Sequence, residues 1–194
     1  MAEEMNPAAQ QEEEKKLPYE EWFYWLQTMV TAIVCIVLAF TFLGRITRVV
    51  GHSMDPTLSD GELLLVWSLG YEPKAGDIVV CNKTPATFLQ GDAIVKRVIA
   101  TQGQTVDIDY DANRVYVDGQ PLDEPYTLEW MDWPNHPDMQ QTHFEVPEGS
   151  VFLMGDNRNG STDSRHQELG AVDTQYILGK AVFVFFPLTR FGLL

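Results

Sequence analysis

An uninterrupted run of 22 uncharged residues, Trp22–Leu43, constrains this chain more than any other feature. At 1.5 Å per residue, a helix of that length spans about 33 Å, which matches the roughly 30 Å hydrocarbon core of a bilayer. Aromatic residues gather at its start and Arg45 follows its end, as is typical of segments that meet both membrane interfaces. The run predicts a transmembrane helix over 22–43.

This helix is expected to be retained. A cleavable secretory signal has a basic leader, a shorter apolar centre and a small-residue cleavage site, whereas the leader here, residues 1–21, is polar and rich in Glu. Charge leaves the orientation open, because Lys15 and Lys16 before the helix balance Arg45 and Arg48 after it.

Residues 45–194 form one block of the size usual for a single domain. Short β-branched and aromatic runs alternate there with Gly, Pro, Asn and Asp, a pattern typical of strands, and Asp118-Gly119 predicts a tight turn. Residues 122–143 predict a long loop or an inserted hairpin. The expected strands are Leu63–Trp67, Asp77–Asn82, Ala93–Ala100, Thr105–Asp109, Arg114–Val117, Ser150–Met154 and Lys180–Phe186. The predicted fold class is mainly β, an antiparallel β-sheet domain anchored by one N-terminal transmembrane helix.

Charge and composition exclude several functions. The 28 acidic residues against 13 Lys and Arg give a net charge of −15, which argues against a nucleic-acid partner. Cys35 lies in the apolar run and Cys81 in a strand-like run, so we expect no disulfide between them. The four histidines are scattered and lack the spacing of a zinc-ligand signature. The sequence therefore predicts neither a metal nor a cofactor.

A candidate nucleophile lies shortly after the apolar run, in the segment Gly51-His52-Ser53-Met54-Asp55-Pro56. A Ser beside Gly, with Pro three residues later, predicts a tight turn. Such a turn exposes a hydroxyl and aims backbone N–H groups at one point, as an oxyanion site requires. Taken alone, an ordinary surface turn is the simpler interpretation.

A candidate base lies in the apolar strand Ile94–Ile99, which carries two adjacent cations, Lys96 and Arg97. They fall on opposite faces, so we expect that they are not both in the core. An inward Lys96 loses hydration, which lowers its pKa from the ordinary value of about 10.4 and lets the neutral amine take a proton from a serine. A solvated Lys96 with Val95 and Ile99 buried is the alternative.

A third polar segment, residues 155–165, follows another predicted strand. Within it, Asp163 and Arg165 can form a charge-assisted ion pair, and Ser161 offers a hydroxyl that can orient an amine. By itself this segment has the composition of a loop.

In order and spacing, these three segments, together with Gly76-Asp77-Ile78-Val79-Val80, resemble the type I signal peptidase family. Its members are membrane-bound serine proteases that remove signal peptides from exported proteins. The resemblance implies that Ser53 is the nucleophile and Lys96 the general base of a Ser–Lys dyad, one of the convergent variants of the serine triad. It also implies that Ser161 orients the lysine amine and that Asp163 and Arg165 hold the shape of the site.

The same resemblance implies where the substrate binds. Gly51 stands where some members place a serine hydroxyl as a second oxyanion donor. Shallow pockets are expected to select small residues at positions −3 and −1 of a signal-peptide-bearing preprotein. The residues implied to line these pockets are Val49, Met54, Leu58 and Ile94.

The resemblance further implies a single-pass protein of the plasma membrane, with residues 1–21 in the cytoplasm and the catalytic domain outside. We expect a monomer whose partners are preproteins and membrane lipid. Two alternatives stay open: a membrane-tethered, non-catalytic β module that binds peptides, and a self-cleaving Ser–Lys repressor, which would need a DNA-binding domain. The clustered aromatics Trp130, Trp133 and Phe183–Phe186 fit the membrane interface or the protein interior equally well.

Overall fold

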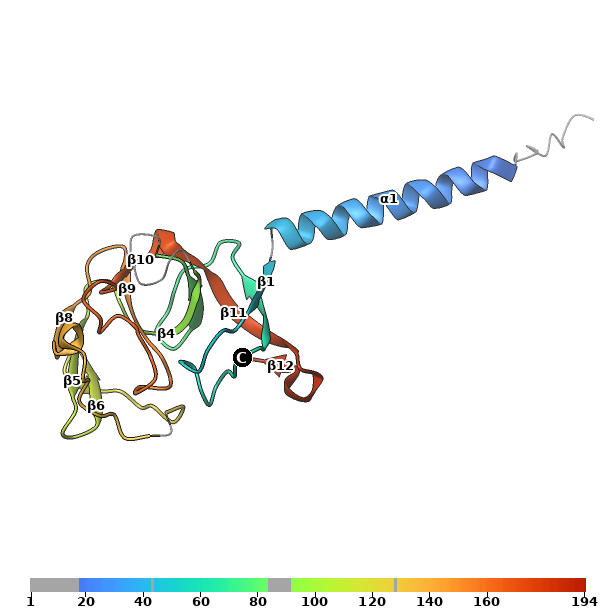
Figure 1. Cartoon of the computed structure of the whole chain (residues 1–194). Helices are drawn as coiled ribbons and strands as arrows, with labels where there is room; N and C mark the ends of the chain where they lie inside the picture. Colours follow the sequence, from blue (N-terminus) through green and yellow to red (C-terminus); the bar gives the residue numbers. More distant parts are fainter. Residues whose placement is uncertain (1–17, 43, 84–91, 128) are drawn as a thin grey trace, which may run out of the picture. The chain divides into compact units, whose positions relative to one another are not determined.

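The structure is a computed structural model, and it describes residues 18–42, 44–83, 92–127 and 129–194 (Figure 1). The chain divides into two compact units near residue 40. Most of the expected polar leader, residues 1–17, lies outside the described residues. The first unit holds helix α1 and the second is a β domain.

Helix α1 covers Pro18–Phe42 and so begins four residues before the predicted start. Its segment Glu21–Leu38 is long and apolar enough to cross a membrane, and none of that segment is buried. A helix of a soluble domain would cover its apolar stripe with the core. Among the described residues, α1 is the one candidate membrane span.

The β domain consists of twelve strands in the described residues, and the pairings between them are antiparallel, which confirms the predicted fold class. The strands are β1 (Gly44–Arg48), β2 (Leu63–Trp67), β3 (Ile78–Cys81), β4 (Ile94–Thr101), β5 (Thr105–Asp109), β6 (Arg114–Val117), β7 (Gln120–Pro121), β8 (His143–Glu145), β9 (Ser150–Met154), β10 (Val172–Asp173), β11 (Ile177–Phe186) and β12 (Gly192–Leu193). Three short 3₁₀ turns complete the elements: η3 (Pro137–Met139), η4 (Thr174–Tyr176) and η5 (Leu188–Arg190).

Two sheets make up the domain. The larger has the order β1-β2-β11-β3-β4-β9-β10, with β12 beside β11, and the smaller has the order β7-β6-β5-β8. In Figure 1 the smaller sheet lies at the opposite side of the β domain from β12. All seven predicted strands are present, whereas the sequence missed β1 and the two- and three-residue strands. Strand β4, which carries Lys96, therefore lies inside the larger sheet between β3 and β9.

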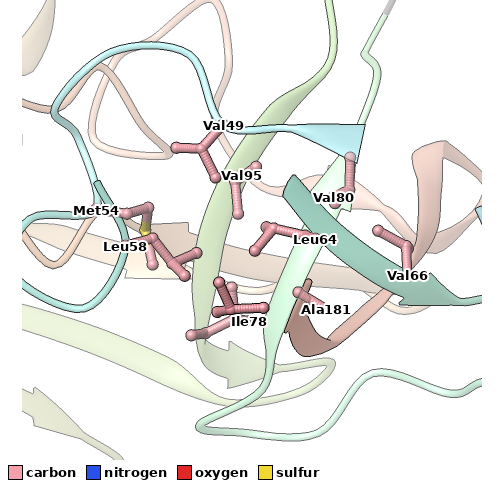
Figure 2. Packing of buried hydrophobic residues seen from close by; sticks show 10 residues of the cluster. Val49, Met54, Leu58, Leu64, Val66, Ile78, Val80, Val95 and Ala181 are labelled. Atoms are coloured by element: carbon pink, nitrogen blue, oxygen red, sulfur yellow. The ribbon is translucent and has the colours of Figure 1, made fainter. Parts of the chain in front are cut away.

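A first core cluster packs the turn after β1 against β2, β3, β4 and β11 (Figure 2). Its buried members are Val49, Met54, Leu58, Leu64, Val66, Ile78, Val80, Val95, Ala181 and Val184. Burying one such aliphatic side chain contributes about 1.5–3 kcal/mol. The cluster thus fixes the turn that carries Ser53 on the sheet that carries Lys96.

The segment 122–143 forms a loop in its described residues, with the single turn η3, and not a hairpin of its own. Trp133 packs on Tyr110 with ring centroids 4.7 Å apart, and its indole N–H donates to Asp111. Trp130 and Phe185 are exposed. The aromatic residues thus divide between packing contacts and open surface.

Substituting Gly179 by Ala should destabilise the β domain by roughly 1–3 kcal/mol. A Cβ at this position of β11 would lie 2.3 Å from the Trp67 carbonyl oxygen of the neighbouring strand. The melting temperature of the full-length protein in detergent, followed by circular dichroism, measures the loss. Gly192→Ala in β12 is the matched control, because its Cβ meets nothing closer than 4.0 Å. Equal melting temperatures for the two variants would contradict this account of the packing.

Candidate active site

Ser53 lies in a tight turn that follows edge strand β1. Gly51, at the start of the turn, has a φ of 85°, a conformation that glycine adopts without steric cost. Its N–H donates to the Asp60 carboxylate over 2.8 Å, and the Leu58 N–H donates to the Met54 carbonyl over 2.9 Å. These bonds close the turn from both ends, and Ser53 is left partly exposed within it.

The Lys96 amine lies directly against this turn. Its Nζ is 2.7 Å from Ser53 Oγ and 3.0 Å from the Val95 carbonyl oxygen. Lys96 is opposite Val79 of β3 in the sheet register and is only 3% exposed. The structure therefore agrees with the interpretation in which the Lys96 side chain points inward, and not with the one in which it is solvated.

Burial lowers the pKa of the Lys96 amine from its ordinary value. The Asp163 carboxylate opposes this shift, and the Arg165 guanidinium reinforces it. A lowered pKa leaves more of the amine neutral near pH 7, and a neutral amine within hydrogen-bond reach can accept the Ser53 proton. The Cys81 thiol is no competing nucleophile, because burial raises its pKa to about 12.

The loop after β9 is bonded to the Ser53 turn. The Asn157 N–H donates to the Ser53 carbonyl over 3.1 Å, and the Asn157 side-chain amide donates to the His52 carbonyl over 3.0 Å. Gly155 makes the closest approach: a Cβ there would lie 2.4 Å from the Ser53 carbonyl oxygen and 2.3 Å from Ser161 Oγ. Only glycine fits between these two serines.

Asp163 and Arg165 form the ion pair that the sequence predicts, at 2.8 Å, and both are buried. The Asp163 carboxylate also accepts the Gly155 N–H over 3.0 Å, and Arg165 donates to the Arg158 carbonyl over 2.7 Å. Despite complete burial, the Arg165 guanidinium and the Gly155 N–H hold the pKa of Asp163 below its ordinary value. The pair thus fixes both ends of the loop that touches Ser53.

Ser161 is buried close to the dyad, and its hydroxyl has no hydrogen-bond partner among the described residues. The expected contact between the Ser161 hydroxyl and the Lys96 amine is therefore not formed in this structure. Ser161 Oγ and the Ser53 carbonyl oxygen nevertheless both lie close to Gly155. The Ser161 hydroxyl lies near the Asp163 carboxylate instead and contributes to the lowered pKa of that group.

The four predicted pocket residues do not share one surface. Val49, Met54 and Leu58 belong to the first core cluster and are 3% exposed or less. Ile94 is partly buried and packs against a different cluster that contains Val79 and Val98. The structure brings the first three together behind the Ser53 turn and leaves Ile94 apart from them.

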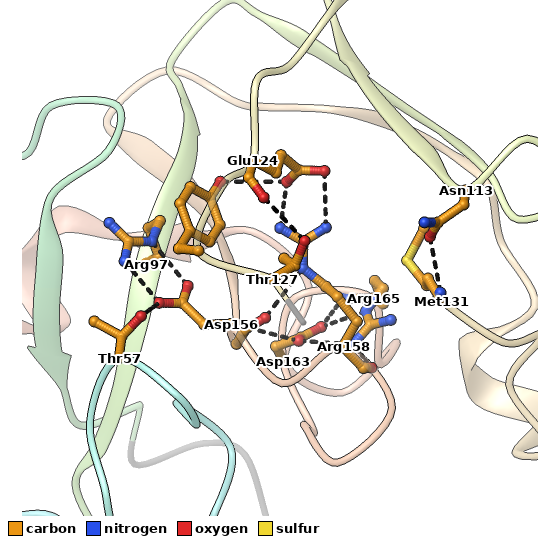
Figure 3. A network of polar contacts seen from close by, with 12 residues as sticks. Thr57, Arg97, Asn113, Glu124, Thr127, Met131, Asp156, Arg158, Asp163 and Arg165 are labelled. Atoms are coloured by element: carbon orange, nitrogen blue, oxygen red, sulfur yellow. Dashed lines mark hydrogen bonds and ion pairs between the residues drawn. The ribbon is translucent and has the colours of Figure 1, made fainter. Parts of the chain in front are cut away.

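The contacts of Arg97 are not evident from the sequence. Its guanidinium makes two hydrogen bonds to the Asp156 carboxylate, at 2.8 and 2.6 Å, and Asp156 also accepts from the Thr57 hydroxyl over 2.5 Å (Figure 3). Lys96 is buried and Arg97 is only partly buried, with a side chain that is 12% exposed, so the structure agrees with the expectation that the two cations are not both in the core. A bidentate carboxylate replaces the water that Arg97 loses.

The segment after β7 extends this polar network. Glu124 pairs with Arg158, and the Tyr126 ring lies 4.0 Å from the Arg97 guanidinium. The network in Figure 3 therefore links the loop after β9 to the segment that carries Thr57, to strand β4 and to the segment after β7. A carboxylate directly after Gly155 and an arginine directly after Lys96 were the sequence signals for it, but pairing them requires the strand register.

Comparisons with known proteins identify the family. The sequence matches the family described as signal peptidase, peptidase S26, over residues 22–186. It is 41% identical to a probable signal peptidase I-1 of Synechocystis over 173 residues, which cover 84% of this chain and 82% of the relative. It is 37% identical to a signal peptidase I of Bacillus licheniformis over 179 residues, which cover 87% and 90%.

A solved structure of a signal peptidase I from Enterococcus faecalis V583 aligns with a TM-score of 0.43 and 27% identity, covering 57% of this chain and 97% of that one. On the sequence match, the chain belongs to the signal peptidase, peptidase S26 family. It is accordingly an enzyme, a hydrolase of the serine endopeptidase class.

Replacing Asp163 by Asn should cost about 3–5 kcal/mol of unfolding free energy, because it leaves the buried Arg165 charge without its partner. Urea unfolding followed by tryptophan fluorescence measures this. Since the folded-state pKa of Asp163 is lowered, its contribution is full above the ordinary carboxyl pKa near 4 and disappears as pH falls through the folded-state value. The wild-type and Asp163→Asn proteins should therefore converge in stability at strongly acidic pH.

The matched control is Asp107→Asn, whose partner His143 and own side chain are largely exposed. It should change the unfolding free energy far less. Equal losses at positions 107 and 163 would show that burial of the Asp163–Arg165 pair is not what matters.

Proposed function

We propose that this protein is a membrane-bound signal peptidase I that removes signal peptides from exported preproteins, with Ser53 as nucleophile and neutral Lys96 as general base. The observation that carries the proposal is the 2.7 Å contact between Lys96 Nζ and Ser53 Oγ, made by a lysine whose pKa burial lowers. The 32–41% identical relatives named signal peptidase I support the substrate class.

The reaction follows from that contact. The Lys96 amine takes the Ser53 proton as Oγ attacks the scissile carbonyl, and the Ser53 backbone N–H donates to the developing oxyanion. The Lys96 ammonium then gives its proton to the leaving amine, and an acyl-enzyme remains on Ser53. The regenerated amine deprotonates a water, which hydrolyses the ester. No metal or organic cofactor is needed.

Substrate binding uses the edge of the larger sheet. Strand β1 pairs only with β2 in the described residues, and it leads directly to the Ser53 turn. An extended peptide that adds to such an edge gains main-chain hydrogen bonds, while small pockets select its side chains. We propose that these pockets are shallow because the buried residues Val49, Met54 and Leu58 fill the space behind the Ser53 turn, and Ile94, which packs against a different cluster, is not part of them.

The membrane arrangement is part of the proposal. Helix α1 anchors the protein in the plasma membrane, with the N-terminus in the cytoplasm and the β domain outside. Anchoring holds enzyme and preprotein in one thin layer, which raises their effective concentration. Because Ser53, Lys96 and the Asp163–Arg165 pair all come from one chain, we propose a monomer that contacts lipid through α1.

Ser53→Ala and Lys96→Met should each lower the cleavage rate by about 10³-fold or more, because members of a catalytic unit fail together. Methionine keeps the length of the lysine side chain without its amine. The rate is measured on a signal-bearing precursor with full-length enzyme in detergent. Sequencing of the new N-terminus should place the cut after small residues at −3 and −1.

The matched control is Lys74→Met, which removes an exposed lysine of the loop before β3 and should leave cleavage at the wild-type rate. Circular dichroism checks that the variants fold. Substantial cleavage by a folded Ser53→Ala or Lys96→Met protein would end the dyad assignment.

The cleavage rate should rise with pH as Lys96 loses its proton, because only the neutral amine acts as base. Since burial lowers the Lys96 pKa, the midpoint of this rise should fall below the ordinary lysine value of about 10.4. Initial rates between pH 5 and 10 measure it. A flat profile across the neutral range would indicate a different base.

A further inference from the structure

The structure brings together two histidines that lie far apart in the sequence. His136 caps turn η3 in the loop before β8, and His166 directly follows Arg165 of the loop after β9. Their ring centroids are 5.2 Å apart. Asp138 is beside them, and one potential ligand atom from each of the three residues lies within 4.8 Å of the other two.

We propose that His136, Asp138 and His166 bind a Zn²⁺ ion. Two imidazoles and one carboxylate form a donor set that zinc favours, whereas Mg²⁺ and Ca²⁺ favour sites made of oxygen ligands. The three ligand atoms lie within 4.8 Å of one another. Ligand atoms that are about 2.0–2.2 Å from a tetrahedral zinc ion are closer to one another than that, so the present spacing is near that of an open zinc site. Zinc binding would therefore bring the three ligand atoms closer together than this upper bound.

The backbone already holds the two sides of this site together. The Gln167 N–H donates to the Asp138 carbonyl over 3.0 Å, next to both histidine rings. The Asp132 N–H donates to the Asn159 side chain over 2.9 Å and so makes a second link between the same two loops. These two hydrogen bonds hold the backbones of the two loops next to each other, so the ligands from both loops start close together.

Access and ring chemistry also fit. The side chains of His136 and Asp138 are about half exposed, so an ion reaches the cluster from solvent, while His166 is 8% exposed. Each ring accepts a backbone N–H at Nδ1 over 3.3 Å, from Asp138 and from Glu168. At 3.3 Å, both contacts are longer than a typical protein hydrogen bond.

The ion would link the loop 130–141, which carries His136 and Asp138, to the loop after β9, which carries His166. A cavity of about 500 Å³ adjoins it, lined by both histidines and by Arg158, Ser161 and Arg165. Since His166 is covalently next to Arg165, fixing its ring restrains the backbone that presents the Asp163–Arg165 pair. An ion that binds the folded protein and not the unfolded chain also raises the stability of the folded protein by mass action.

The test is zinc titration of the full-length protein in detergent, prepared without a polyhistidine tag, in competition with a chromophoric chelator. One equivalent of Zn²⁺ should bind, and Co²⁺ should give visible absorption bands of a low-coordinate site. His136→Gln and Asp138→Asn, both at exposed positions, should each weaken zinc binding at least about tenfold. Saturating zinc should raise the melting temperature of the wild type and not of these variants.

The matched control is His143→Gln, which removes an exposed histidine that pairs with a single aspartate. It should bind zinc as the wild type does. Unchanged affinity in His136→Gln, or an equal loss in His143→Gln, would overturn the site. His166→Gln is buried and needs a check of folding, so the two surface variants carry the conclusion. Binding is measured without substrate, so its result is independent of the proposed peptidase activity.

Discussion

Enclosing a lysine ammonium removes the water that stabilises its charge, and the architecture around Lys96 depends on this effect. Strand β4 lies between two neighbouring strands in the larger sheet, and the Lys96 side chain is buried where it meets the Ser53 turn. A nearby carboxylate would normally restore the charge, and Asp163 is close enough to act on the amine. Arg165 neutralises that carboxylate at 2.8 Å and itself disfavours a second cation. The buried ion pair thus has an electrostatic role besides its structural one: it allows an acidic side chain near the dyad without protonating the base.

The dyad also depends on contacts between distant segments. Ser53 reaches Lys96 because the first core cluster packs its turn on the sheet, and Gly155 lets the loop after β9 approach the backbone of Ser53 closely. Arg97 and Asp156 join the strand of the base to that closing loop, with Thr57 bonded to the same carboxylate. Lys96 is thus followed by a residue that ties its strand to the loop after β9, and the turn that carries Ser53 is tied to the same loop through Thr57. This pattern explains why a hydroxyl and an amine from separate loops and strands meet within hydrogen-bond distance.

Much of this was predictable from the sequence, and the limits have physical causes. Strands such as Ser150–Met154 can be predicted because β-branched and apolar runs between turn residues indicate them locally. Helix α1 can be predicted because residues 22–43 form a long run without charged side chains. The two-residue strands have too little sequence to show a period.

The Arg97–Asp156 pair depends on register, which local patterns do not specify, and the same holds for His136 and His166. Burial of Lys96 stayed open for a related reason: alternation on a strand says which residues share a face, not which face is covered. The inserted segment 122–143 carried no periodic signal, so its docking on the loop after β9 was not predictable.

The most direct test of the account is the titration of Lys96 itself. Protein labelled with ¹³C in its lysine side chains gives a Cε resonance whose chemical shift reports the charge on Nζ, and the Lys96→Met spectrum assigns it. The account predicts that this resonance titrates at a clearly lower pH than those of the exposed lysines, because burial disfavours the ammonium. A Lys96 resonance that titrates together with the exposed lysines would contradict the claim that the site holds a neutral amine against Ser53.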